Sequence, residues 1–112
     1  MAMRYYISLP DPARARGTDP ALSFHSHGAD GLAAELQDAL HSDRLFEQWR
    51  AQQEEPDEVD PALGATDADT TVKGEQHDLH IDLVVTTSLP SVVLRLGLLA
   101  GNGWQLRDVT SA

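Results

Sequence analysis

The chain has no cysteine, and basic and aromatic residues are scarce. Its 112 residues include 8 Lys and Arg against 18 Asp and Glu, which gives a formal net charge of -10, and aromatic residues make up only 5%. The lack of cysteine excludes disulfides, thiolate metal sites and cysteine nucleophiles, and it fits the reducing cytoplasm. The acidic charge disfavours contacts with the phosphates of nucleic acids and with anionic membranes.

The chain also lacks a long hydrophobic run. The longest such stretch, over residues 92–100, is interrupted by Arg95 and is far shorter than a bilayer requires. The N-terminus lacks the apolar core of a signal peptide. We therefore expect a soluble cytoplasmic protein with no nucleic-acid or membrane partner. Its length suits a single domain over residues 1–112.

Apolar residues at every second position, and short runs rich in strand-forming residues, predict the strands. Leu79 is expected to open the third strand with its side chain in the core, and Gly74 to mark a turn or bulge after the second. The strands predicted are residues 3–9, 70–72, 79–87 and 104–109.

A helical pattern of apolar residues covers residues 30–51, with Asp30 as the expected N-cap and an irregularity near residue 42. Two stretches beside this helix lack periodicity. Residues 10–29 are predicted to form a long loop. Residues 52–69 contain seven acids and two prolines, and we expect a mobile acidic connector that adds nothing to the core.

A second helix is expected to follow the third strand. Ser88 is a suitable N-cap, and Pro90 would sit in the first turn, where its missing N–H is not needed. Gly101, or the pair Asn102 and Gly103, would end this helix in a left-handed conformation.

The predicted element order, β-α-β-β-α-β, indicates an α+β fold. It is typical of a ferredoxin-like two-layer sandwich, with an antiparallel sheet of order 4-1-3-2 and both helices on one face. The other face of the sheet would remain open to a ligand or another subunit. The residues predicted to form a binding surface on this open face are Arg4, Tyr6, His80, Asp82 and Arg107.

Four of the five histidines fall into two clusters, which the predicted topology places at the same rim of the sheet. Neutral imidazole is the commonest protein ligand for transition metals, and carboxylates complete many such sites. The sequence therefore suggests a divalent-metal site as the one candidate cofactor, although it contains no strong zinc motif. The candidate ligands are His25, His27, His77, His80 and Asp82.

Evidence for catalysis is weaker. His80 with Asp82 could act as a base and its orienting partner, but no nucleophile or oxyanion hole can be assigned. Ser88 is better explained as a helix cap. The spacing of acids from Asp67 to Asp78 does not fit a calcium loop, because Val72 occupies the position that requires glycine. The sequence thus favours a protein that is not an enzyme without deciding the point.

Three hypotheses for function follow. The leading one is a binding domain that self-associates, as a homodimer, through its sheet face or the edge of its second strand and recognises a basic protein partner. The alternative is a histidine-dependent metal-binding protein or small enzyme, with its site at a rim formed by residues 24–28 and 77–82. The third, based on charge alone, is an acidic inhibitor that occupies a basic site.

Overall fold

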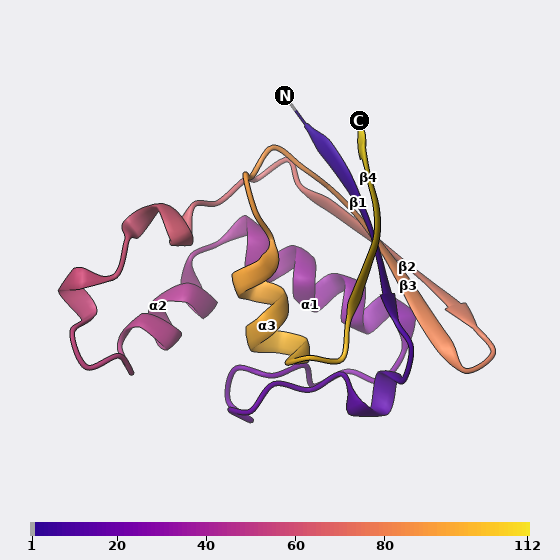
Figure 1. Cartoon of the computed structure of the whole chain (residues 1–112), viewed down its shortest axis with the longest axis horizontal. Coiled ribbons are helices and arrows are strands. Elements are labelled where there is room, and N and C mark those ends of the chain that lie inside the picture. The colour runs from indigo at the N-terminus through magenta and orange to yellow at the C-terminus, as the bar shows by residue number, and fades with distance from the viewer. Residues whose placement is uncertain (1) are drawn as a thin grey trace.

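A computed structural model describes residues 2–112, which fold as α+β with a four-stranded sheet and three α-helices (Figure 1). The helices lie on one side of the sheet. Three short 3-10 turns lie in the long connections: Pro12–Arg14, Pro56–Glu58 and Pro61–Gly64. The main elements are β1 (Met3–Leu9), α1 (Ala29–His41), α2 (Arg44–Arg50), β2 (Thr71–His77), β3 (His80–Thr87), α3 (Val93–Ala100) and β4 (Gln105–Ser111).

The sheet has the order β2-β3-β1-β4, and every pair of neighbouring strands is antiparallel. Counted from the β4 edge, this order is 4-1-3-2, as the sequence predicts. The bounds of β1 also match the prediction. None of the helices within residues 2–112 has the length and apolar character needed to cross a membrane.

The core lies between the covered face of the sheet and the apolar sides of α1 and α3. Alternate residues of β1 and β3 face the helices, and each such large side chain contributes about 1.5–3 kcal/mol by its burial. The most deeply buried core side chains are Ile7, Leu9, Leu32, Leu36, Leu40, Ile81, Leu83, Val85 and Leu96.

The first helical region divides where the sequence predicts. Helix α1 ends at His41, Ser42 adopts an extended backbone, and α2 begins at Arg44. The predicted N-cap is wrong by two residues, because Gly28, not Asp30, precedes the first helical residue.

Strand β2 is longer than predicted, and Gly74 does not mark a turn. It lies in the middle of β2, opposite Leu83 of β3, where α1 approaches the sheet closely. A Cβ on Gly74 would lie 2.3 Å from the carbonyl oxygen of Ala29. The turn comes later, at Asp78 and Leu79. The Leu79 side chain is therefore not in the core but 86% exposed, which corrects the sequence prediction.

Helix α3 begins at Val93, five residues after the predicted cap. Ser88 does not cap it. Its backbone N–H and its hydroxyl both donate hydrogen bonds to Oδ2 of Asp67, at 2.9 and 3.0 Å. Pro90 accordingly precedes the helix instead of lying in its first turn. The predicted helix end is correct, since Gly101 follows the helix with a φ of 61°.

The acidic connector is attached to the rest of the fold at its C-terminal end. The buried Arg95 donates hydrogen bonds to the carbonyls of Leu63 and Ala65, both at 2.8 Å, and Ala65 packs against the core. Asp67 then accepts hydrogen bonds that tie the connector to the end of β3. The expectation that this segment adds nothing to the core is thus wrong at its last residues.

The 10–29 loop is also fixed to the fold. The carbonyl of Leu99 accepts hydrogen bonds from the backbone N–H of Gly17 and of Phe24, at 3.2 and 2.9 Å. The Phe24 side chain is buried in the core. These contacts hold the loop beneath α3 and determine where the histidines that follow Phe24 can lie.

Replacing Gly74 by alanine should destabilise the protein by about 1–3 kcal/mol, because the added methyl group would force the backbones of β2 and α1 apart. Gly97→Ala is the matched control. A Cβ at this exposed position of α3 meets nothing within 4 Å, so this change should stabilise the protein by about 1 kcal/mol through helix propensity. Urea unfolding measures the stability of both variants. Equal changes in stability for Gly74→Ala and Gly97→Ala would contradict the close approach of α1 to the sheet at Gly74.

Asp67→Asn should destabilise the protein more at pH 7 than at pH 3. The backbone N–H groups of Ser88 and Asp69, helped by the hydroxyls of Ser88 and Thr70, lower the pKa of the Asp67 carboxyl. A group with a lowered pKa contributes its full stabilisation above its unfolded pKa, about 3.9 for Asp, and the contribution declines as the pH falls from there through the folded pKa, so it is smaller at pH 3 than at pH 7.

Denaturant midpoints of wild type and variant at the two pH values test this prediction. Asp69→Asn removes the same charge from an exposed position and should change little. The same difference in denaturant midpoint between wild type and Asp67→Asn at both pH values would rule out the charged carboxylate as the source of the stabilisation.

Candidate functional site

The β2–β3 turn brings two histidines together. His77 and His80 form the last residue pair of this hairpin, on either side of a turn in which Asp78 has a φ of 34°. Directly opposed residues in an antiparallel pair project from the same face. The two rings are consequently stacked, with centroids 5.0 Å apart and planes 15° from parallel.

Two carboxylates stand beside these rings on the open face. Asp82 lies two residues after His80, and its oxygens are 3.3 Å from Nε2 of His77 and 3.5 Å from Nε2 of His80. Glu75 lies directly opposite Asp82 on β2. Its Oε1 is 3.6 Å from Nε2 of His77. The period of two along both strands therefore gathers two imidazoles and two carboxylates at one end of the sheet.

The arrangement has the dimensions of a metal site. His77, His80 and Asp82 each offer one ligand atom, and these atoms lie within 4.8 Å of one another. Nitrogen and oxygen ligands of a tetrahedral zinc ion, 2.0–2.2 Å from the metal, lie about 3.3–3.5 Å apart. Oδ2 of Asp82 lies at such a distance from His77, 3.3 Å, and Oδ1 of Asp82 from His80, 3.5 Å, so each imidazole faces a different oxygen of the same carboxylate. Glu75, with Oε1 3.6 Å from Nε2 of His77, is a neighbouring carboxylate outside this group of three.

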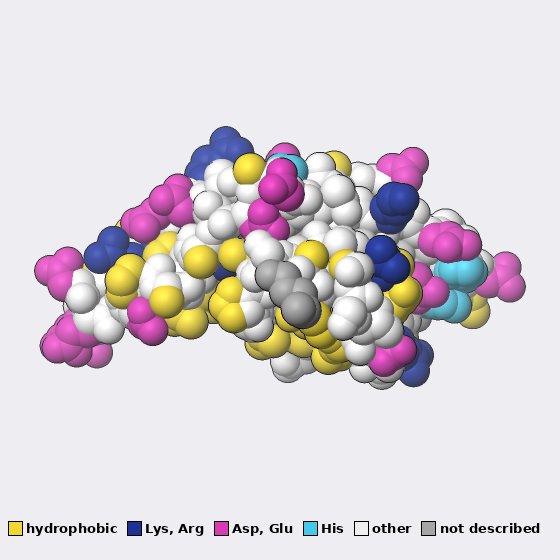
Figure 2. Space-filling view, turned by 90° about the horizontal axis from the view of Figure 1, so that it is seen from above, with side chains coloured by type: hydrophobic (Ala, Val, Ile, Leu, Met, Phe, Trp, Pro, Cys, Tyr) yellow, Lys and Arg dark blue, Asp and Glu magenta, His cyan; other side chains and the backbone are white. Residues whose placement is uncertain are grey.

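The cluster is accessible to solvent. The side chains of His77, His80 and Asp82 are 40%, 43% and 40% exposed. In Figure 1 the hairpin extends past the end of α1, and Figure 2 shows histidine side chains among carboxylates at the same end of the molecule. An ion could therefore reach the ligands without opening the fold.

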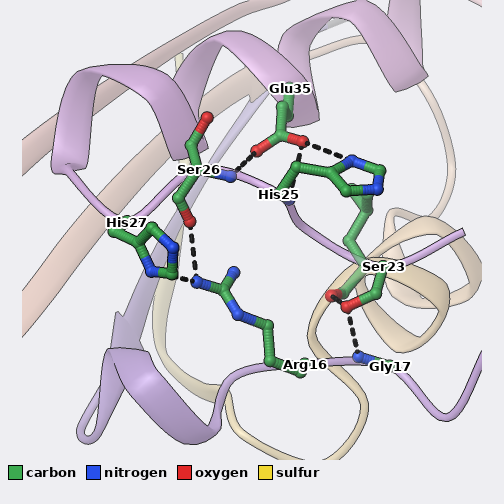
Figure 3. A network of polar contacts seen from close by, with 8 residues as sticks. Arg16, Gly17, Ser23, His25, Ser26, His27 and Glu35 are labelled. Atoms are coloured by element: carbon green, nitrogen blue, oxygen red, sulfur yellow. Dashed lines mark hydrogen bonds and ion pairs between the residues drawn. The ribbon is translucent and has the colours of Figure 1, made fainter. Parts of the chain in front are cut away.

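The other two predicted metal ligands lie in a separate network (Figure 3). The Glu35 carboxylate accepts hydrogen bonds from the N–H groups of His25 and Ser26, both at 2.9 Å, and lies 3.4 Å from Nδ1 of His25. Arg16 lies 3.0 Å from Nδ1 of His27. Burial raises the pKa of Glu35, but the hydrogen bonds from His25 and Ser26 outweigh it, so that the pKa is lowered overall.

This network explains why the two histidine clusters do not combine. Glu35 belongs to α1, so its hydrogen bonds hold His25 and Ser26 against that helix. His77 and His80 instead lie at the turn of the β2–β3 hairpin, and the tip of this hairpin extends past the helix end (Figure 1). Within residues 2–112, the group with metal-binding dimensions contains three of the five predicted ligands, and neither His25 nor His27 belongs to it.

The predicted binding residues of the open face lie along two shallow hollows. Tyr6, Glu75 and Val84 line both hollows, and Arg4 lines the one near the start of β1. The other hollow, of about 470 Å³, is lined by Tyr6, Asp82 and Arg107 among others. His80 lies at the end of this face beside Asp82.

Glu75 is the site residue that the sequence prediction missed. Ending the second strand at residue 72 removed Glu75 and His77 from the sheet, so their common face with His80 and Asp82 was not apparent. The signal was present, because residues 71, 73, 75 and 77 are polar and alternate with residues on the covered face of the sheet. A strand continued to His77 would have indicated all four side chains.

No protein-family model matches the chain, and comparisons with curated proteins and with solved structures also give no match. The function must therefore be inferred from the geometry of the chain's own residues.

Proposed function

We propose that this protein binds a divalent transition-metal ion, with zinc favoured, at the tip of the β2–β3 hairpin. The observation that carries the proposal is the approach of the ligand atoms of His77, His80 and Asp82 to within 4.8 Å of one another on one face of a regular hairpin. Their positions follow from strand pairing and not from mobile loops, which favours a defined geometry.

The ligand types select the class of metal. Imidazole nitrogens suit zinc, copper, nickel and iron, whereas calcium and magnesium prefer ligand sets made entirely of oxygen. Two imidazoles with one carboxylate leave at least one coordination position for Glu75 or water. The formal net charge of -10 also favours attraction of a cation.

Binding is better supported than catalysis. Catalytic metals act in sites from which water is largely excluded, where electrostatic effects are strong. Here the side chains of His77, His80 and Asp82 are each 40% or more exposed. A structural or sensing role, in which the ion fixes the hairpin tip for a partner, fits this exposure.

We further propose that the fold is ferredoxin-like. The element order, the antiparallel sheet and the placement of the helices on one side support this assignment.

A protein-binding role for the open face is a second proposal, because Arg4, Tyr6 and Arg107 lie along one surface there. The same proposal includes a basic partner, which the acidic charge supports. It also includes a cytoplasmic location, which the lack of cysteine supports.

Isothermal titration of metal-free protein with Zn²⁺ tests metal binding. We expect one ion per chain, and His77→Ala, His80→Ala and Asp82→Asn should each weaken binding at least tenfold, since each removes one ligand. His25→Ala is the matched control, because it removes an exposed histidine outside the cluster. It should leave the affinity unchanged.

Two results would contradict the proposal. One is the absence of stoichiometric Zn²⁺ binding to folded wild-type protein. The other is an equal loss of affinity in His25→Ala and His80→Ala, which would indicate non-specific binding to surface histidines. Circular dichroism of each variant shows whether the hairpin change has altered the fold.

A further inference from the structure

Strand β4 is an edge strand that is exposed along almost its whole length. Apart from Thr110, which is partly buried, every residue from Gln105 to Ser111 is exposed. Leu106 and Val109 pair with Ile7 and Tyr5 of β1, so they project from the covered face, yet they are 50% and 38% exposed. The apolar side of β4 is thus left uncovered next to a free strand edge.

A β-bulge changes which residues of β4 project from the same face of the sheet. Tyr6 pairs with Asp108 while Ile7 pairs with Leu106, which leaves Arg107 as the extra residue. Arg107 lines the open-face hollow together with Tyr6 and Asp108. Arg107 and Asp108 therefore share the open face although they are adjacent in sequence, as the two residues of a bulge commonly do.

This pattern makes β4 complementary to a second copy of itself. In an antiparallel pair with its two-fold axis between residues 107 and 108, Arg107 of each copy would oppose Asp108 of the other. The same register places Leu106 opposite Val109, both on the covered face. It also places Gln105 opposite Thr110, both on the open face, since they pair with Ser8 and Arg4.

We propose that two copies of this chain associate through β4 in this register and form a continuous eight-stranded sheet. The interface is isologous, as two-fold dimers require. It satisfies two cross-strand charge pairs and two apolar pairs, each of which stabilises an antiparallel ladder. It also pairs backbone groups along the β4 edge, where the N–H of Val109 exchanges its hydrogen bond to Oδ1 of Asp108, 2.8 Å long in the single chain, for one to the other copy.

The opposite edge of the sheet is less suited to this role. The backbone N–H of Val72 in β2 already donates a hydrogen bond to Oε1 of Gln37 at 3.0 Å. The carbonyl of Ala29 at the start of α1 approaches the same strand at Gly74. Helix α1 therefore obstructs β2, and the association expected at the edge of the second strand is assigned to β4 instead.

Sedimentation equilibrium with EDTA present tests the proposal independently of metal binding. Wild type should form a dimer of twice the 12.2 kDa chain mass. Arg107→Asp and Asp108→Arg should each weaken the dimer about tenfold or more, because each replaces two attractive cross-strand pairs by two repulsive ones. The double exchange, Arg107→Asp with Asp108→Arg, recreates opposite charges in the same register and should restore the dimer.

Lys73→Asp is the matched control, since it makes the same change of charge on the exposed face of the other edge strand. It should leave the dimer intact. The proposal is overturned if wild type remains monomeric up to about 1 mM, a weak limit for specific association. It is also overturned if Lys73→Asp weakens the dimer as much as Arg107→Asp, or if the double exchange fails to restore a dimer while remaining folded.

Discussion

The register of the β2–β3 hairpin is the constraint on which the rest of the structure depends. A two-residue turn pairs His77 with His80 and, further along, Gly74 with Leu83. Because side chains alternate with a period of two, a shift of one residue would turn every side chain of β2 to the other face. The same pairing that lets α1 approach the sheet at Gly74 therefore also places the histidines and carboxylates on the open face.

The placement of the helices explains why the two candidate surfaces lie where they do. Helices α1 and α3 lie on one side of the sheet, so the polar faces of β1, β2 and β3 remain open to solvent. The hairpin extends past α1, which leaves its tip free for an ion. At the other edge β4 retains exposed apolar residues on the covered side. The proposed metal site at the hairpin tip and the proposed dimer edge at β4 thus lie on different strands, although Asp82 and Arg107 line the same hollow of the open face.

The sequence predicts the parts of the fold that follow from local periodicity. The bounds of β1 and the break between α1 and α2 are both evident from the spacing of apolar residues. Tertiary contacts decided what the sequence did not show. Gly74 resembles a turn residue, but it is a glycine because a helix backbone lies against it. Ser88 resembles a helix cap, but its N–H and hydroxyl donate to Asp67, twenty-one residues earlier in the chain.

At the candidate site, the sequence identified the histidines as candidate ligands. It did not show which of them lie together, because that depends on the length of the hairpin and on the hydrogen bonds that hold His25 against α1.

The central claim is that a metal ion binds through Nε2 of His77 and His80. Long-range ¹H–¹⁵N correlation spectra of the imidazole rings, recorded during addition of Zn²⁺, test it at the level of single atoms. We expect the Nε2 resonances of His77 and His80 to shift together and to reach a limit at one equivalent, while those of His25, His27 and His41 stay in place. Shifts that appear first at His25 or His27, or rings of His77 and His80 that do not respond, would contradict the claim.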